Sequence, residues 1–358
     1  MSGSKEFITI EAEGSAYEIG FAHGTLGKKQ VLNSINTYKV MFKDYSNLSW
    51  DLAKERSRAY IEPIQNYDKD IMEEIRGVAE GAGVDIEDIL ALNARSEVIM
   101  MTGSAVPSGG CTSCAITPES TLSGNTILAQ NWDWKGDQIE SMVVLKIKQK
   151  NKPNITMITE GGIIGKIGFN SCGLGVCLNA LGMKGNPKGL PLHVILRGIL
   201  NREKISDAIE RINSVQNACA ANYLIAHKVG EALDVEKAPG DFDVLYPVDG
   251  IITHSNHFTV DRLKPNDTLR LMASDSYMRK GRSDKLLRQY KGKIDINVVK
   301  SVLRDHADYP DAICRHTDPK DDPGLAHCTV FSIIMDLSAQ QMYVTKGAPC
   351  ESEYQLIK

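Results

Sequence analysis

The residue pattern changes abruptly near Pro107, and this change constrains the fold more than any other feature of the sequence. After a short strand-like run at residues 7–14, apolar residues recur at helical spacing through the first hundred residues. Beyond Pro107 come small residues and then short runs rich in β-formers, such as TILAQNW, SMVVLKIKQ and NITMITE. We therefore expect one structural domain made of a helical N-terminal segment, residues 1–110, and a sheet-forming part, residues 111–358.

Helices and strands are predicted in separate blocks over the whole chain. Residues 73–100 indicate two helices that separate at residues 81–83, with Asp85 as the N-cap of the second. Further helices are expected within 191–215 and 269–306, and further strands at 221–228, 232–238, 329–337 and 340–347. Blocks of this kind favour an α+β architecture of stacked sheets covered by helices over a regular βαβ alternation.

Charge and hydropathy exclude several classes of partner. The 358 residues include 41 basic and 45 acidic side chains, a net charge of −4, with no long run of either sign. A basic stripe of the kind that binds nucleic acid or an anionic membrane surface is therefore not predicted. No stretch reaches about 18 consecutive apolar residues, and the first residues lack the apolar core of a signal peptide. We expect a cytoplasmic protein.

Eight cysteines are spread thinly along the chain, which indicates reduced thiols rather than a disulfide framework. Cys111 and Cys114 form a C-x-x-C pair, and such a pair can bind zinc or act in redox chemistry. A zinc site needs a second pair of ligands at similar spacing, and none is apparent. The sequence therefore predicts no metal and no resident cofactor, and a thiol-redox or metal protein using Cys111 and Cys114 stays an alternative.

Cys111 directly follows two glycines in the stretch VPSGGCTSCA. Glycine at positions 109 and 110 removes the side chains that would hinder a tight backbone conformation at this point. A thiol is an intrinsically good nucleophile, and here it could attack the carbonyl of Gly110. Cleavage between Gly110 and Cys111 would give Cys111 a free α-amino group. With an ordinary pKa of about 7.7–8.0, that group can act as base for the thiol of the same residue.

Nine sequence blocks in order resemble the isopenicillin N acyltransferases, also called acyl-coenzyme A:6-aminopenicillanic acid acyltransferases. These enzymes form peptidase family C45, within the N-terminal nucleophile (Ntn) hydrolases. The blocks are EIGFAHG at 18–24, EEIRGVAEGAG at 73–83, LNARSE at 92–97, GCTSC at 110–114, QNWDW at 130–134, TEGGIIGKIGFNSCGLGV at 159–176, LNAL at 178–181, THSNH at 253–257 and YPDAICR at 309–315. The resemblance implies the four-layer αββα Ntn-hydrolase sandwich.

The same resemblance assigns site residues. It implies that Gly110–Cys111 is the self-cleavage site and that Cys111 is the nucleophile. Asp133 matches an aspartate that would hold the Cys111 amino group, and Asn256 matches an asparagine whose N–H would donate to the oxyanion. Asn179 matches a second such donor of bile-salt-hydrolase-like enzymes. Arg315 matches an arginine near the nucleophile, where its positive charge would favour the thiolate.

Each of these residues also has a structural interpretation. Asp133 could cap a turn, Asn256 could bridge a loop, and Arg315 could belong to an ion pair. His254 and His257 flank Asn256, but the amino group already supplies a base, so we do not count them as catalytic.

The predicted function is acyl transfer to or from a linear amide, through an acyl-thioester on Cys111. The expected partners are a small-molecule amide or acyl donor, an amine acceptor, and the chain's own cleaved N-terminal fragment. Acyl-coenzyme A is possible as a substrate, although the sequence has no Gly-rich phosphate loop. Hydrolysis and transfer both stay open. The alternative from another class is a binding protein that keeps the fold without turnover.

Overall fold

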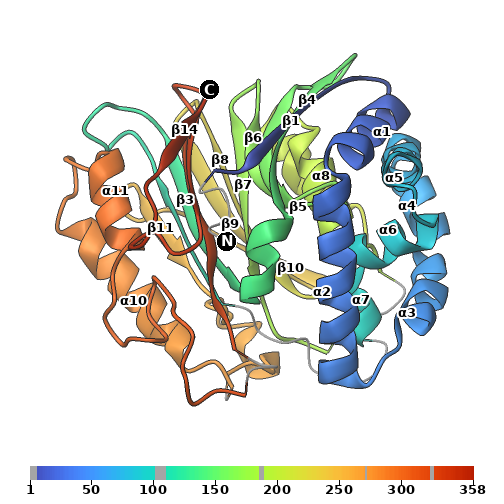
Figure 1. Cartoon of the computed structure of the whole chain (residues 1–358). Helices are drawn as coiled ribbons and strands as arrows, with labels where there is room; N and C mark the ends of the chain where they lie inside the picture. The colour runs from blue at the N-terminus through green and yellow to red at the C-terminus, as the bar shows by residue number, and fades with distance from the viewer. Residues whose placement is uncertain (1–5, 101–109, 185–188, 271, 323–325) are drawn as a thin grey trace.

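The computed structural model describes residues 6–100, 110–184, 189–270, 272–322 and 326–358. Two β-sheets face each other at the centre, and helices cover the outer face of each sheet (Figure 1). The helices α1 to α8 lie on the side of the larger sheet, and α10 and α11 lie against the smaller one. The four-layer αββα sandwich predicted from the sequence is confirmed.

The larger sheet has eight strands in the order β1-β4-β5-β6-β7-β8-β9-β10. All neighbours are antiparallel except the first pair, in which β1 runs parallel to β4. The strands are β1 (Ile8–Gly14), β4 (Met142–Gln149), β5 (Ile155–Glu160), β6 (Ile167–Asn170), β7 (Leu174–Ala180), β8 (Ala221–His227), β9 (Glu231–Ala238) and β10 (Asp241–Leu245).

The smaller sheet is antiparallel throughout and has the order β11-β2-β3-β12-β13-β14. Its central strands β2 and β3 are buried along their whole length, which leaves no solvent-exposed face at the middle of the sheet. The strands are β2 (Cys111–Ile116), β3 (Ile127–Trp134), β11 (Ile251–His254), β12 (Cys328–Asp336), β13 (Gln341–Lys346) and β14 (Gln355–Ile357).

The helices of the outer layers follow the predicted blocks. On the larger sheet they are α1 (Ala16–Leu26), α2 (Lys28–Ser46), α3 (Trp50–Ser57), α4 (Ile61–Tyr67), α5 (Lys69–Ala82), α6 (Ile86–Asn93), α7 (Arg95–Met100), α8 (Leu192–Leu200) and α9 (Ile205–Asn213). On the smaller sheet they are α10 (Asp275–Arg288) and α11 (Ile296–Leu303). Short 3₁₀ turns lie at Arg58–Tyr60, Gly136–Ser141 and Lys264–Asn266.

The predicted break between α5 and α6 is confirmed, whereas the single helix predicted from there to residue 100 is divided at Ala94 into α6 and α7. Gly83 ends α5 in the left-handed conformation, with φ of 70°, which glycine adopts without the strain that a side chain would cause. Asp85 is the N-cap of α6 and forms a capping box with Asp88.

Glycines in two of the sequence blocks let α1 and α5 pack backbone to backbone. A Cβ atom on Gly20 would lie 2.0 Å from the carbonyl oxygen of Glu74, and one on Gly77 would lie 2.2 Å from that of Tyr17. Any larger residue at these positions would force the helices apart. The blocks EIGFAHG and EEIRGVAEGAG thus form one helix–helix contact.

The N-terminal segment is built into the rest of the molecule. Strand β1 pairs with β4 from Ile8–Val143 to Gly14–Gln149, and one continuous apolar core contains side chains from α2, α5 and both sheets. The predicted strand at residues 7–14 is therefore confirmed, and it joins the larger sheet.

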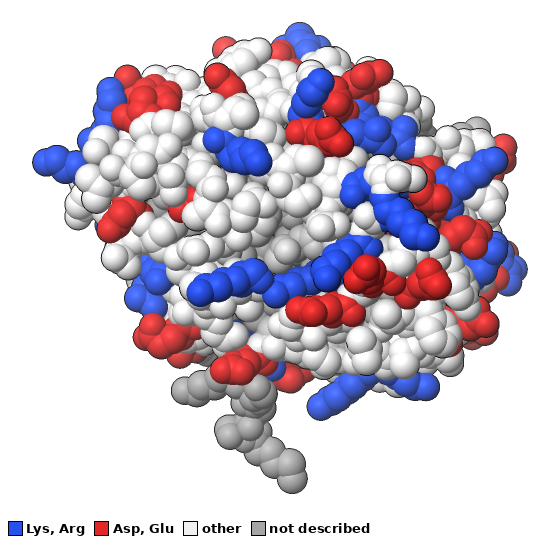
Figure 2. All heavy atoms as spheres, turned by 90° about the horizontal axis from the view of Figure 1, so that it is seen from above, with Lys and Arg blue, Asp and Glu red and all other residues white. Residues whose placement is uncertain are grey.

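The surface seen from above carries acidic and basic side chains side by side, with a short row of basic ones across its middle (Figure 2). Within the described ranges, no helix is long and apolar enough to cross a membrane.

Candidate active site

Cys111 is the first residue of β2, between β11 and β3 in the smaller sheet. Its side chain joins the core between the two sheets, whereas Cys114 packs in the separate cluster beneath α10 and α11. Residues three apart on a strand point to opposite faces. The C-x-x-C interpretation, in which Cys111 and Cys114 act together on a metal or in redox chemistry, is therefore wrong.

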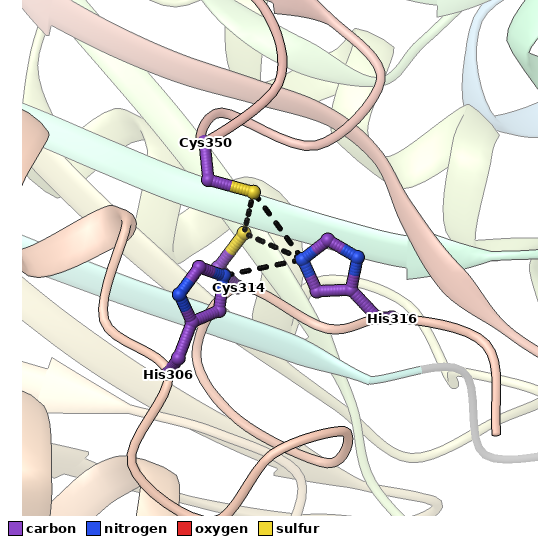
Figure 3. Close-up of side chains that lie close together, drawn as sticks. All are labelled: His306, Cys314, His316 and Cys350. Atoms are coloured by element: carbon purple, nitrogen blue, oxygen red, sulfur yellow. Dashed lines mark hydrogen bonds between the residues drawn. The ribbon is translucent and has the colours of Figure 1, made fainter.

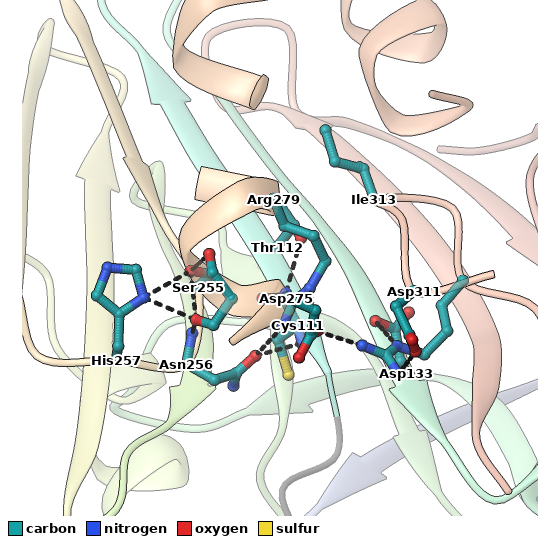
Figure 4. Close-up of polar contacts among 12 residues, drawn as sticks. Cys111, Thr112, Asp133, Ser255, Asn256, His257, Asp275, Arg279, Asp311 and Ile313 are labelled. Carbon is teal, nitrogen blue, oxygen red and sulfur yellow. Dashed lines mark hydrogen bonds and ion pairs between the residues drawn. The ribbon is translucent and has the colours of Figure 1, made fainter. Parts of the chain in front are cut away.

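Three side chains from different elements hold the backbone of Cys111, and Figure 4 shows two of them, those of Asn256 and Arg279. The Cys111 N–H donates to Oδ1 of Asn256 at 2.8 Å. On the other side of the residue, its carbonyl oxygen accepts from Arg279 at 2.7 Å and from Nδ2 of Asn179 at 3.3 Å. Arg279 is buried in α10 and also donates to Oδ1 of Asn256 at 3.0 Å. The nucleophile candidate is thus fixed at both ends.

Gly110 lies against Asp133. The backbone N–H of Asp133 donates to the Gly110 carbonyl oxygen at 2.7 Å. A Cβ atom on Gly110 would lie 2.4 Å from Oδ2 of Asp133 and 3.0 Å from Nε of Arg315. A side chain at position 110 would therefore have to displace the carboxylate of Asp133.

Asp133 is fully buried in β3 and has one unsatisfied carboxylate oxygen. Its Oδ1 accepts from the hydroxyl of Thr329 at 2.7 Å, whereas Oδ2 has no hydrogen-bond donor and lies 3.6 Å from Nε of Arg315. Burial raises the pKa of Asp133, and Arg315 and Arg279 act in the opposite direction. A buried carboxylate oxygen aimed at Gly110 can accept a proton or a hydrogen bond at the Gly110–Cys111 peptide.

Arg315 faces carboxylates rather than the thiol. Besides Asp133, it pairs with Asp311 at 2.6 Å and with Asp275, which also binds Arg279 at 2.9 Å. A continuous polar chain therefore runs from Cys111 through Arg279, Asp275 and Arg315 to Asp133 (Figure 4).

Burial is the largest influence on the pKa of the Cys111 thiol. Burial and the nearby carboxylate of Asp133 raise the pKa of Cys111, whereas Arg279, Asn256 and Lys166 lower it, and the result is a pKa of about 11. In the intact chain the thiol is therefore protonated at neutral pH. Any nucleophilic step needs a group that accepts its proton.

The predicted site residues meet in one place. Cys111 begins β2, Asp133 and Asn179 lie near the ends of β3 and β7, and Asn256 lies in the loop after β11. These four residues lie around Gly110, and Arg315 reaches them through Asp133. The amide nitrogens of Asn256 and Asn179 donate to the carbonyl oxygens of Ala180 and Cys111, respectively. Their roles as oxyanion donors, and a direct effect of Arg315 on the thiol, stay predictions.

Arg279, Asp275 and Thr329 are additional residues of the network that the sequence did not indicate. Arg279 and Asp275 lie one turn apart on α10, a helix with many charged residues, and nothing in SDSYMRKGRSD separates a buried arginine from an exposed one. Thr329 lies at the start of β12 and resembles any other strand threonine.

His254 and His257 stabilise the loop that carries Asn256. His254 pairs with the buried Glu236 at 2.8 Å, and His257 bonds to Ser276 at 2.7 Å. The hydroxyl of Ser276 also accepts from the backbone N–H of Asn256 at 2.7 Å. Both histidines therefore hold Asn256 in position through its loop.

A small pocket in the described part of the chain opens onto Cys111 from between the two sheets. Its walls include two tryptophan rings and two cations, with the lining residues Arg95, Trp132, Trp134, Lys166, Leu178 and His193. Lys166 donates to the buried Glu160 at 2.6 Å and lies 3.3 Å from the ring centre of Trp132. Burial lowers the pKa of Lys166 to about 8.

Comparison with known proteins identifies the family. The family model described as "Acyl-coenzyme A:6-aminopenicillanic acid acyl-transferase" matches residues 121–351. The chain is 30% identical over 345 residues to the acyl-coenzyme A:6-aminopenicillanic-acid-acyltransferase 40 kDa form of Emericella nidulans, covering 96% of this chain and 93% of the relative. The chain belongs to the acyl-coenzyme A:6-aminopenicillanic acid acyl-transferase family. The resemblance read from the sequence is confirmed.

Solved structures similar to this member of the family include an acylase and a hydrolase. Penicillin V acylase from Agrobacterium tumefaciens is 13% identical with a TM-score of 0.47, over 66% of this chain and 83% of that one. A mutant form of conjugated bile acid hydrolase from Clostridium perfringens is 13% identical with a TM-score of 0.45, over 69% of this chain and 96% of that one.

Proposed function

We propose that this acyltransferase-family protein cleaves itself between Gly110 and Cys111 and then transfers or hydrolyses the acyl group of a linear amide through a thioester on Cys111. The observation that carries the proposal is the pair of hydrogen bonds that bracket the Gly110–Cys111 peptide. Asp133 donates to its carbonyl oxygen at 2.7 Å, and Asn256 accepts from its N–H at 2.8 Å.

In the self-cleavage step, the sulfur of Cys111 attacks the carbonyl carbon of Gly110. Negative charge develops on the Gly110 oxygen, where the N–H of Asp133 already points and would stabilise it. The C–N bond breaks, the thiol proton passes to the leaving nitrogen, and a thioester links Gly110 to Cys111. Water then hydrolyses the thioester, which gives a Gly110 carboxylate, a free thiol and a free α-amino group on Cys111.

In the mature enzyme, the new amino group accepts the thiol proton when a substrate amide binds. Asn256 Oδ1, which accepts from the Cys111 nitrogen in the intact chain, would orient that amino group. The sulfur attacks the substrate carbonyl, and the proton passes on to the departing amine as the acyl-thioester forms. Water or an amine acceptor then takes the acyl group and restores the thiol.

The pocket beside Cys111 supports an acyl group with an apolar or aromatic body that carries a negatively charged group. Trp132 and Trp134 offer ring surface, and Arg95 and Lys166 share the single carboxylate of Glu160, at 3.6 Å and 2.6 Å. The buried Glu97 carboxyl also lies near Arg95, and burial raises its pKa to about 7. Below that pH the two cations of the pocket wall outnumber the one ionised carboxylate, and little water competes for the remaining charge.

Intact-mass measurement and denaturing electrophoresis of freshly purified protein test the self-cleavage. We expect the parent chain to give fragments of about 12 and 27 kDa, obtained by dividing 39.3 kDa in proportion to 110 and 248 residues. Cys111→Ala should stay whole and inactive. Cys114→Ala is the matched control, because that thiol lies on the opposite face of the strand and its loss should leave cleavage unchanged.

Release of amine from a panel of linear N-acyl amides, with and without an added amine acceptor, tests the acyl chemistry. We expect turnover by the parent and by Cys114→Ala, and none by Cys111→Ala. A parent chain that stays whole after prolonged incubation would contradict self-cleavage. A cleaved chain that turns over no amide of the panel would instead favour a binding protein that keeps the fold.

A further inference from the structure

A second cluster of reactive side chains lies on the far side of Arg315 from Asp133. His306, Cys314, His316 and Cys350 come together from two loops, the first three from the connection between α11 and β12 and Cys350 from the one between β13 and β14 (Figure 3). Each offers one ligand atom, and the four atoms all lie within 4.8 Å of one another. Within the described residues, no other group of three or more His, Cys, Asp or Glu side chains is gathered in this way.

Four of the six distances between these atoms are close to those of a tetrahedral zinc site. Zn–S bonds of about 2.3 Å and Zn–N bonds of about 2.0–2.1 Å give a tetrahedron with edges of roughly 3.3–3.8 Å. The two sulfurs lie 3.5 Å apart, and Nε2 of His316 lies 3.7 Å from the Cys314 sulfur and 3.3 Å from the Cys350 sulfur. The Nε2 atoms of His306 and His316 lie 3.1 Å apart.

We propose that His306, Cys314, His316 and Cys350 bind one zinc ion. Two thiolates and two imidazoles in a tetrahedral arrangement favour Zn²⁺ over the hard cations, which prefer oxygen ligands. Binding would release one proton from each thiol to solvent, and the two thiolates would then neutralise the charge of the ion. Protein side chains would fill all four coordination positions of the ion, so no position would be free for a substrate. The ion would therefore be structural.

Neighbouring residues hold His316 and the loop of Cys350 in position for an ion. Nδ1 of His316 lies 3.6 Å from a carboxylate oxygen of Glu351, so the ring nitrogen that does not face the cluster has an acidic neighbour. Zinc-binding histidines commonly have such a carboxylate partner, which fixes the orientation of the ring. Arg304 donates to the carbonyl of Pro349 at 2.7 Å and so ties the loop of Cys350 to the end of α11.

Solvent access and sulfur spacing also fit a metal. His306 and Cys350 are exposed, which gives an ion a path to the buried Cys314. The sulfur–sulfur distance of 3.5 Å is far longer than the disulfide bond of about 2.05 Å. A reduced pair of thiols at this spacing can share an ion without backbone movement.

The cluster is joined to the candidate active site through the chain itself. Cys314 and His316 point into the cluster, and Arg315 between them points the opposite way, to Asp133 at 3.6 Å. The backbone N–H of Arg315 donates to the hydroxyl of Thr329, which in turn donates to Asp133. A zinc ion would therefore fix the segment that positions Arg315 against Asp133, although zinc binding itself does not depend on the proposed acyl chemistry.

The test is zinc stoichiometry on full-length protein that carries no polyhistidine tag. After reduction, removal of metal by a chelator and titration with Zn²⁺, we expect about one zinc per chain for the parent. Cys350→Ser and His306→Ala, both at exposed positions, should bind at least tenfold more weakly. Cys172→Ser, at a partly exposed cysteine elsewhere in the molecule, is the control and should bind like the parent.

Cobalt substitution gives a second readout. Co²⁺ in the parent should show the visible bands of a tetrahedral site together with thiolate-to-cobalt charge transfer, and both should be lost in Cys350→Ser. The proposal fails if the reduced parent binds no zinc, or if Cys350→Ser binds it as tightly as the parent. It also fails if the purified protein is two hydrogens lighter because Cys314 and Cys350 are joined by a disulfide.

Discussion

At the scale of single residues, the Gly110 contact shows why glycine precedes the cysteine. The notable feature is the lack of space beside Oδ2 of Asp133, where a Cβ atom would come within 2.4 Å. Glycine thus lets a buried carboxylate approach the peptide bond that is proposed to break. Gly110→Ala would displace that carboxylate or the peptide itself.

We expect Gly110→Ala to slow self-cleavage at least tenfold while the protein stays folded. The rate would be measured by intact mass over time after purification, with circular dichroism as the check on folding. Gly281→Ala on α10 is the control, because a Cβ atom there meets nothing within 4 Å. Cleavage of Gly110→Ala at the parental rate would show that Asp133 is not needed beside the scissile peptide.

Arg279 is expected to matter as much as the residues that the sequence pointed to. Arg279→Gln removes a donor to the Cys111 carbonyl, leaves Asp275 paired with Arg315, and should lower the cleavage rate at least tenfold. Arg282→Gln is the matched control on the same helix, since Arg282 pairs with Asp305 at 2.8 Å. Equal rates for the two variants would contradict a positioning role for Arg279.

A pH profile tests the charge that the pocket offers to a substrate. Burial lowers the pKa of Lys166 to about 8. The amine is therefore charged below about pH 8, and its charge is lost as the pH rises through that value. KM for an acyl group that carries a carboxylate should therefore rise above about pH 8. A neutral analogue of the same shape is the control, and its KM should not follow this titration. Lys166→Met should make the two substrates behave alike.

Much of the site could be predicted from residue types, but the hydrogen bonds and ion pairs that connect its residues could not. Cys111, Asp133 and Asn256 lie in short blocks whose residue order is distinctive. Arg279 lies in a helix of ordinary charged composition, and its burial depends on how α10 packs against β11 and β2. Likewise, the zinc ligands come from 306–316 and from Cys350, a separation that no standard zinc spacing covers.

At the scale of secondary structure, long patterned segments were predictable and short glycine-rich ones were not. Strand β6 and the start of β7 lie within GKIGFNSCGLGV, where glycines interrupt the alternation and tertiary pairing decides the conformation. Strands β10, β11 and β14 were also absent from the prediction, and the last two have only four and three residues. β11 pairs with β2, which lies far earlier in the chain, so no local pattern marks it. β10 follows β9 across the turn at Pro239 and Gly240, and β14 follows β13, so these two were missed although their partners are near in sequence.

The contact between α1 and α5 gives a prediction about stability. Gly20→Ala inserts a methyl group 2.0 Å from the carbonyl oxygen of Glu74, so the helices must separate. Overpacking of this kind costs about 1–3 kcal/mol. We expect a loss of that size in the free energy of unfolding, measured in urea on the Cys111→Ala background so that one uncleaved chain is compared throughout. Gly281→Ala should show no loss, and equal stability of both variants would contradict the close approach.

At the scale of the whole molecule, the proposed cleavage would cut the chain without dividing the fold. Strand β1 lies on one side of the cleavage point and β4 on the other, yet they form seven paired positions of one parallel ladder. The core likewise combines α2 and α5 with strands of both sheets. Separating the fragments would expose this shared apolar surface to water, at about 25 cal/mol for each Å².

The two fragments should therefore stay together after cleavage. In native gel filtration we expect the cleaved parent and the whole Cys111→Ala chain to elute at the same volume, although denaturing electrophoresis separates only the parent into two bands. Mixing the sample with increasing urea before chromatography should release both fragments together with the loss of tertiary signal, since no fragment has a complete core. A 12 kDa species released in native buffer would contradict this, because β1 would then have left the larger sheet without unfolding it.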